Sequence, residues 1–227
     1  MRQGFNEHPV NPLPPVVWLL AAPIIIGEIL FGLGSAGLAG DAATGWRLEA
    51  LQRFAFDPDI FRQMVAQNVW PWRHAARVLT YPFVHASLTQ AAMAIVFILA
   101  LGKFVGEIFA GWAVAVVFFG ATILGALVYA AMPFTQMALF GAYPGAYGLI
   151  GAFTWILWMR IGGNPQHRAR AFSLIGMLAA VQLVFAAIFG GSPDWIAEFA
   201  GFAGGFLLSF VVAPGGWRRT LDRLRRR

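Results

Sequence analysis

The chain has 227 residues, of which 59% are hydrophobic and 11% charged, and its mean hydropathy is +0.68. This is more apolar surface than a soluble domain of the same length can bury, so a lipid bilayer is expected as its solvent. The absence of cysteine excludes disulfides, thiolate nucleophiles and thiolate metal sites. The net charge of +6 comes largely from six arginines in the last eleven residues. Beside apolar spans, such a tail indicates contact with anionic lipid headgroups rather than with nucleic acid.

Six apolar stretches are long enough to cross a hydrocarbon core of about 30 Å, which needs roughly 20 helical residues. They cover residues 15–39, 79–101, 106–131, 143–160, 171–190 and 195–213. The preceding residues carry one arginine and several prolines but no cleavage site, so the first stretch is expected to be an uncleaved anchor. The predicted fold is an all-α, polytopic bundle of six transmembrane helices. We expect a cytoplasmic segment at 1–14, one membrane domain at 15–213 and a basic cytoplasmic tail at 214–227.

One long polar interval, residues 40–78, separates the first two stretches and has a pattern of its own. Apolar residues recur at helical spacing between Trp46 and Phe54, and Asp57 followed by Pro58 is typical of the capped start of a second short helix. The apolar side of that helix would carry Ile60, Phe61, Met64 and Val65. Tryptophans in the interval, at 46, 70 and 72, suit the depth of lipid headgroups. The interval is therefore predicted to be an amphipathic loop that lies partly in the interface.

The basic residues are distributed unevenly between the two sides of the six stretches. Eleven of the sixteen fall on the side that holds both termini, and five fall in the interval 40–78. Because cytoplasmic loops carry the excess of Lys and Arg, both termini are predicted to be cytoplasmic and the interval to face outward. The composition, rich in Ala, Gly and Arg, and the compact six-span form favour the inner membrane of a bacterium.

Three segments carry a family resemblance. They are RVLTYPFVHAS (Arg77 to Ser87), GAYPGAYGLIGAF (Gly141 to Phe153) and GFAGGF (Gly201 to Phe206). They resemble, in order and spacing, the WRxxTxxFxHA, GxSGAxxGLxGAF and AHxGGF segments of the rhomboid family of intramembrane serine proteases. The resemblance covers most of residues 15–213. It implies a six-helix bundle with a long outward-facing loop after the first helix.

Small residues in two of these segments predict a close contact between helices. Gly145, Gly148 and Gly151 share one face of the fourth stretch, and Gly201 and Gly205 share one face of the sixth. Such faces let helix backbones approach closely in lipid. We therefore expect the fourth and sixth helices to pack against each other.

The catalytic positions of the family are occupied by other residues here. The nucleophilic serine corresponds to Tyr143 and the glycine after it to Pro144, while the histidine base corresponds to Phe202. A phenol with a pKa of about 10 is a poor acyl-transfer nucleophile without a base, and proline lacks a backbone N–H. The two further polar positions of the second helix correspond to Gln90 and Ala94, and alanine cannot donate to an oxyanion. No catalytic residue is therefore predicted.

Other residues do not form an obvious replacement for the missing pair. The histidines are His8, His74, His85 and His167, and the serines are Ser35, Ser87, Ser173, Ser192 and Ser209. His85 and Ser87 are two residues apart, which on a helix would point them in different directions. His8 and His167 fall on the predicted cytoplasmic side, and no serine is predicted beside His74. A protease that uses unrecognised residues stays open as the alternative.

The remaining polar residues are interpreted as structural. His85, Arg77 and Glu107 match family positions that the resemblance implies are structural, with His85 helping to hold the outer loop and Glu107 anchoring another. No HExxH or similar spacing occurs, so no metal and no cofactor are predicted. Glu28 lies inside the first stretch, where a carboxylate raises a functional question, and it is expected to pair with a polar group on a neighbouring helix or on a partner protein.

Together these observations favour a non-proteolytic, rhomboid-like membrane protein. Its partner would be the transmembrane segment of another protein, which it would bind as an assembly or retention factor or as an accessory subunit of a larger complex. A small-solute transporter ranks below both protease and binding protein, since the polar residues noted within the spans are few, chiefly Glu28, Gln90 and Gln182.

Overall fold

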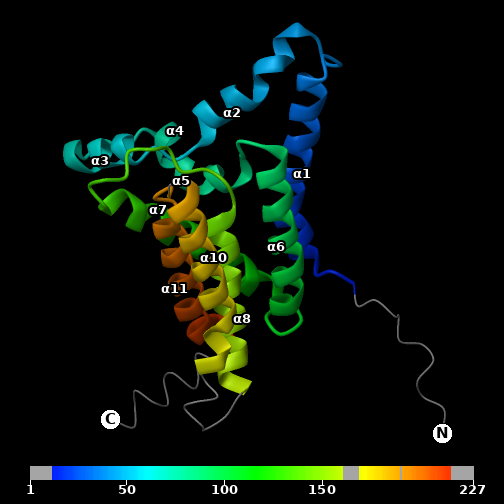
Figure 1. Ribbon diagram of the computed structural model, residues 1–227, viewed down its shortest axis with the longest axis vertical. Coiled ribbons are helices and arrows are strands. Elements are labelled where there is room, and N and C mark those ends of the chain that lie inside the picture. The colour runs from blue at the N-terminus through cyan, green and yellow to red at the C-terminus, as the bar shows by residue number, and fades with distance from the viewer. Residues whose placement is uncertain (1–11, 161–168, 190, 216–227) are drawn as a thin grey trace, which may run out of the picture.

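The structure is a computed structural model that describes residues 12–160, 169–189 and 191–215 (Figure 1). The long helices are α1 (Pro15–Ser35), α6 (Leu88–Gly106), α7 (Gly111–Ala131), α8 (Tyr143–Arg160), α10 (Ser173–Phe189) and α11 (Trp195–Val212). The short ones are η1 (Asp41–Gly45), α2 (Trp46–Phe54), α3 (Pro58–Gln67), α4 (Trp72–Ala75), α5 (Arg77–Thr80), η2 (Tyr81–Phe83) and η3 (Arg170–Phe172). The prediction of an all-helical chain is confirmed for these residues, in which the β-structure is limited to one isolated bridge between Phe56 and Leu139.

Four of the long helices are long and apolar enough to cross a bilayer. They are α1, α6, α7 and α11. The chain is thus a multi-pass membrane protein by the length and composition of its helices. The two remaining helices of the predicted six, α8 and α10, are present but do not reach the same measure of length and hydropathy.

Helix α8 is less apolar than its neighbours because most of it does not face lipid. Its residues are buried almost without interruption from Pro144 to Ile156, between α6, α7 and α11. Glycine and alanine, which suit close helix packing, replace the large apolar residues that a lipid-facing helix needs. A hydropathy threshold set for lipid-facing helices is therefore not suited to a helix that is enclosed by protein.

The second predicted span was placed too early in the chain. Residues 79–87 do not continue α6 but form the end of α5, the short helix η2 and a turn. Pro82 lies in η2, and Ser87 ends the turn by accepting a hydrogen bond from the Gln90 N–H at its Oγ, 3.2 Å away, which caps α6. The segment is apolar for another reason: Tyr81 is fully buried and its hydroxyl donates to the Thr122 carbonyl at 2.8 Å. The third span likewise starts later than predicted, at Gly111.

The interval 40–78 contains the two short helices that its pattern predicts. Helix α2 covers Trp46–Phe54, and α3 starts directly after Asp57, whose Oδ1 accepts from the backbone N–H groups of Asp59 and Ile60 at 2.9 and 3.0 Å. Of the predicted apolar side of α3, Met64 is buried but Val65 is exposed. Figure 1 shows these helices lying across one end of the long bundle.

The long helices form two neighbouring groups. Helices α1 and α6 run side by side, with Gly102 of α6 directly against Val17 of α1 (Figure 1). Helices α7, α8 and α11 pack closely together, and α10 lies beside α8. Helix α8 joins the two groups through its contacts with α6. The start of α1 and the end of α11 lie at the same end of the bundle, opposite α2 to α4.

Candidate functional site

The first turn of α8 is where the family resemblance places a nucleophile, and a tight turn leads into it. Gly141 has φ of +92°, a conformation that favours glycine, and its N–H donates to the Tyr81 carbonyl at 2.9 Å. A Cβ at this position would lie 3.4 Å from both Gln90 Nε2 and His85 Cδ2. The turn therefore seats the start of α8 directly against the start of α6.

Tyr143 points its hydroxyl at the main chain of α6. The hydroxyl donates to the Gln90 carbonyl at 3.2 Å, and the ring stacks edge-on to Phe97 with centroids 6.4 Å apart. Pro144 follows, buried in the first helical turn, where a missing N–H leaves no helical bond unmade. The phenol is thus a hydrogen-bond donor that links α8 to α6.

Of the two positions on α6, only Gln90 keeps a side chain that can donate a hydrogen bond. The Gln90 side chain folds back on its own helix start, where Oε1 accepts from the Ala86 N–H at 2.9 Å. Ala94 is fully buried and offers a methyl group. The Gln90 amide nitrogen can still donate a hydrogen bond, but Ala94 cannot replace an oxyanion donor.

Phe202 lies on α11 within an aromatic neighbourhood. Its ring meets that of Phe172 in η3 edge-on, with centroids 6.4 Å apart. Within the described residues no hydrogen bond or ring contact joins Phe202 to Tyr143. The two family positions therefore carry aromatic side chains that serve separate contacts.

The glycines of α8 and α11 lie where main chains touch. A Cβ on Gly205 would come 2.0 Å from the Gly148 carbonyl oxygen, and one on Gly201 would come 2.2 Å from that of Pro144. A Cβ on Gly151 would come 2.2 Å from the Phe202 carbonyl oxygen. We call this α8–α11 contact, at Gly148, Gly151, Gly201 and Gly205, the glycine seam.

Gly145 has a different neighbour from the one its spacing predicts. A Cβ there would lie 2.6 Å from the Phe118 ring of α7, and Gly148 also abuts Ala121 of α7. Helix α8 is enclosed on several sides, so its small residues serve α7 as well as α11.

His85 is fully buried in the turn before α6. Its Nε2 accepts from the Ala142 N–H at 3.2 Å, and its carbonyl accepts from Arg47 at 3.0 Å. Burial lowers the pKa of His85 to about 4, opposed by the charge of Glu28 and assisted by that of Arg47. At neutral pH the ring is therefore uncharged and acts as an acceptor that holds the loop leading into α8.

Glu28 has a partner on a neighbouring helix of the same chain. Arg47 of α2 donates to both carboxylate oxygens, at 2.9 and 2.8 Å, and its guanidinium lies 5.0 Å from the Phe31 ring centroid. Sequence reasoning anticipated a partner for this carboxylate, and the ion pair supplies it. The pair ties α2 to α1 and, through the His85 carbonyl, to the start of α6.

The other two residues interpreted as structural also lie at junctions. Arg77, at the start of α5, donates to the Gln52 carbonyl of α2 at 3.0 Å. Glu107 directly follows α6, and its N–H donates to the Lys103 carbonyl at 3.0 Å.

Among the described residues, no serine hydroxyl bonds to a histidine ring. His85 and Ser87 do not lie on a helix as predicted, since both precede α6. They are separated instead by their partners: Ser87 caps α6, while His85 binds Ala142. His8 and His167 lie outside the described residues. The described part also contains no group of three side chains placed to hold a metal.

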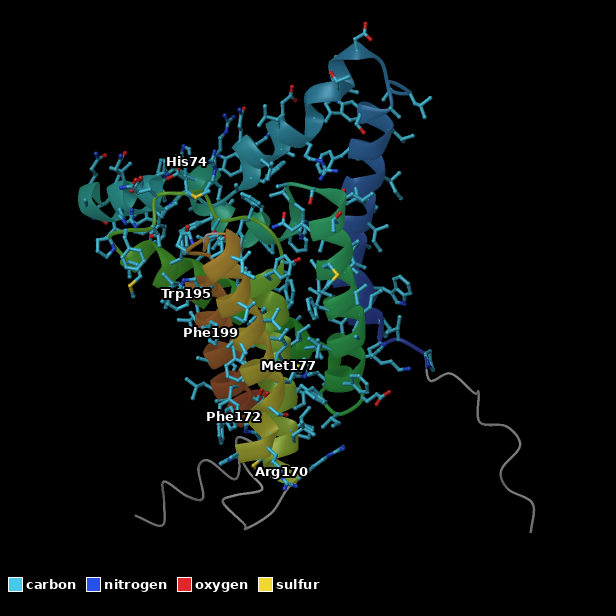
Figure 2. The ribbon with its side chains drawn as sticks, viewed as in Figure 1. His74, Arg170, Phe172, Met177, Trp195 and Phe199 are labelled. Carbon is cyan, nitrogen blue, oxygen red and sulfur yellow. The ribbon has the colours of Figure 1, made fainter. Side chains whose placement is uncertain are left out.

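Sequence reasoning missed a polar cluster between α8, α10 and α11. Glu198 of α11 is 9% exposed, accepts from the Gln182 amide of α10 and shares a hydrogen bond with Tyr147 of α8. We call Glu198, Gln182 and Tyr147 the carboxylate cluster. Figure 2 shows this part of α11 between the labelled Trp195 and Phe199. The available signal was a single carboxylate in an otherwise apolar helix.

A second acid lies just outside α11. Asp194 is hydrogen-bonded to Ser192 and Tyr129, and burial raises its pKa while those two hydrogen bonds oppose the shift. It anchors the start of α11 to the end of α7. The described structure thus contains one buried and one half-buried acid near one end of α11, Glu198 and Asp194, neither at a family catalytic position.

Comparison with known proteins gives one match. A family model described as the Rhomboid domain matches residues 72–215, which is more than half of the chain and includes all three resembling segments. The match begins in α4 and ends just beyond α11. No curated protein matches the chain.

Proposed function

We propose that this chain, which belongs to the rhomboid family, lacks protease activity and binds the transmembrane segments of other membrane proteins. The observation that carries the proposal is the pair of aromatic residues at the catalytic positions. Tyr143 donates to a main-chain carbonyl, and Phe202 packs against Phe172. Acting as an assembly or retention factor, or as an accessory subunit of a complex, requires binding but no proton transfer.

The residue at the family's base position, Phe202, cannot take up a proton. Peptide hydrolysis by an activated hydroxyl needs a neighbouring group that takes its proton. A phenyl ring has no lone pair for that purpose, and no described serine is bonded to a histidine. Restoring the reaction would therefore need at least a nucleophile and a base at once.

The proposal includes a topology. Helices α8 and α10 cross the membrane together with the four longer spans, giving six, and the interval 40–78 faces outward. Support comes from the enclosed position of α8 and from the ends of α1 and α11, which lie at the same end of the bundle (Figure 1). The excess of basic residues supports cytoplasmic termini in a cell with an inner membrane, with the basic tail at anionic headgroups.

The partner would lie on the lipid-facing sides of the bundle. Helix α10 exposes Met177, Val181 and Val184, and α6 exposes Met93 and Val96. Transmembrane helices associate through such surfaces by packing and by isolated polar contacts, without a hydrophobic driving force. A polypeptide span on this side would replace lipid rather than water.

The absence of proteolysis is tested with purified protein. We expect no cleavage of a model transmembrane substrate and no labelling by a serine-reactive phosphonate, with an active rhomboid protease as the positive control. Cleavage together with labelling would establish the alternative, an active intramembrane protease. Identifying the labelled serine would then show which residue replaces Tyr143.

Partner binding is tested in the membrane before extraction. A photo-crosslinking residue placed at Met177 of α10 or Val96 of α6, both exposed, should give discrete protein adducts. Isolation in mild detergent and mass spectrometry then identify the adduct. Recovery of the protein alone from every position and in every detergent would contradict the proposal.

A further inference from the structure

A groove between α1 and α2 combines an apolar lining with two charged side chains of opposite sign. Its apolar lining comes from Leu30, Phe31, Trp46, Ala50 and Phe54. Its charges are Glu49 and Arg53, which lie four residues apart on α2. The groove is open, with a volume of about 360 Å³.

Both charged groups lack a polar partner in the described part of the chain. Neither Glu49 nor Arg53 is in an ion pair or a side-chain hydrogen bond, although the spacing of four residues on a helix would allow them to pair with each other. The Arg53 guanidinium lies instead over the Phe54 ring, 5.6 Å from its centroid. By contrast, Arg47 on the same helix is bound by Glu28. The groove thus offers a free cation and a free anion beside an apolar wall.

The position of the groove along α1 fixes its depth in a membrane. Leu30 and Phe31 lie in the last turn and a half of α1, about 6–8 Å from its end at Ser35 at 1.5 Å per residue. Since α1 has the length of the hydrocarbon core, Leu30 and Phe31 lie in the outer part of the acyl region, just below the level where acyl chains meet headgroups. Trp46 in the lining is a residue type that favours this level.

We propose that the groove binds a single zwitterionic phospholipid with a primary ammonium headgroup, of the phosphoethanolamine class. Arg53 binds the phosphate, and Glu49 accepts hydrogen bonds from the ammonium. One acyl chain lies along Leu30, Phe31 and Phe54 and continues over the exposed apolar face of α1. An anionic lipid satisfies Arg53 alone, and a choline lipid cannot donate a hydrogen bond to Glu49. A second protein helix carries no phosphate for the guanidinium.

The test uses the full-length chain in detergent with added phospholipids of matched acyl chains, counting retained lipids by native mass spectrometry. The wild type should retain one ethanolamine lipid most strongly. Arg53→Gln should lower retention of ethanolamine and glycerol lipids by about fivefold, since both lose the phosphate contact. Glu49→Gln should lower retention of the ethanolamine lipid by a similar factor and leave the glycerol lipid unchanged.

A matched control separates this site from general attraction to basic residues. Arg73 on α4 is exposed and also lies over a ring, that of Trp72, but outside the groove. Arg73→Gln should therefore leave all lipid retention unchanged. Both groove residues are exposed, so their variants should keep the circular dichroism and thermal midpoint of the wild type. Equal retention of the ethanolamine lipid by Glu49→Gln, Arg53→Gln and the wild type would overturn the proposal. So would retention of the choline lipid by the wild type that equals its retention of the ethanolamine lipid.

Discussion

Tyr143 occupies the position that corresponds to the family's serine, a smaller hydroxyl residue. Its larger side chain changes the contacts at the start of α8. The ring fills the space toward Phe97, and the hydroxyl uses its proton to bond the Gln90 carbonyl. A phenol can make this contact only while it is protonated. The residue therefore strengthens the contact between α8 and α6, and its hydroxyl proton is held by a carbonyl oxygen and not by a base.

His85 should make the stability of the protein depend on pH. Its ring is neutral in the folded protein, with a pKa near 4, and ordinary in the unfolded chain, near 6.5. The unfolded state therefore binds more protons between these values, and stability falls as pH is lowered from about 6.5 to 4. The loss should approach about 3 kcal/mol at the low end. Thermal unfolding in detergent at a series of pH values measures it.

The control is His85→Gln, whose side-chain oxygen can still accept from the Ala142 N–H but does not titrate in this range. It should show a shallower decline in the thermal midpoint between pH 6.5 and 4 than the wild type. An equally steep decline would assign the pH dependence to other groups.

At the scale of residues, sequence reasoning identified which groups needed partners better than it identified the partners. A carboxylate at Glu28 requires compensation, but nothing in the sequence points to Arg47, nineteen residues later, rather than to any other cation. Glu198 was missed because its partners, Tyr147 and Gln182, lie on helices whose adjacency is set only by tertiary packing.

At the scale of helices, the glycine seam should be intolerant of even one methyl group. Gly205→Ala would place a Cβ 2.0 Å from a main-chain oxygen of α8, which cannot rotate away. The helices must separate, so we expect a loss of roughly 1–3 kcal/mol of stability. A lower thermal midpoint in detergent would show this.

Gly176→Ala on α10 is the matched control, since a Cβ there meets nothing within 4 Å. Alanine favours helix over glycine, so this variant should be neutral or slightly stabilised. If the two variants behaved alike, the seam would not be the cause of any effect at Gly205.

The carboxylate cluster should couple α8 to α11 energetically. Glu198 accepts the hydrogen bond of Tyr147, so Tyr147→Phe should cost less stability in a Glu198→Leu background than in the wild type. Interhelical hydrogen bonds within membranes give coupling energies of roughly 0.6–1.7 kcal/mol. A double-mutant cycle on unfolding in detergent measures the coupling. Strictly additive effects of Tyr147→Phe and Glu198→Leu would contradict the coupling. The control is the distant pair Tyr147→Phe and Arg73→Gln, whose effects should be additive.

Element boundaries show where local patterns succeed and where they fail. The Asp57 cap and the spacing from Trp46 to Phe54 predicted α2 and α3 well because caps and periodicity are local. The start of α6 was predicted too early because the side chains of Tyr81 and Val84 are buried within the protein and do not face lipid. Hydropathy does not distinguish these two environments.

At the scale of the whole molecule, the proposed orientation can be tested with single cysteines, because the chain has none of its own. His74 and Arg170 mark opposite ends of the structure in Figure 2. We expect a membrane-impermeant maleimide to label Arg73→Cys from outside intact cells but to label Arg170→Cys only after the membrane is opened. The reverse pattern would invert the proposed topology.

The family and the helical class of the chain could be read from its sequence, since glycine positions and apolar runs are both linear features. The count of spans could not be read with the same security. Helix α8 has the composition of a buried helix, and α10 is shorter than the four clear spans. Which helices enclose which depends on contacts that only the assembled structure contains.

The contact of α8 with α11 through main-chain atoms limits where the partner-binding surface that we propose can change. Two helices whose backbones touch behave as one rigid unit, and a larger side chain between them would force the helices to separate. Substitutions by larger side chains are therefore confined to the outer faces of α8 and α11 and to the helices that pack against them. If the proposed function holds, related chains acquire new partners through substitutions on those outer faces, while the α8–α11 contact stays unchanged.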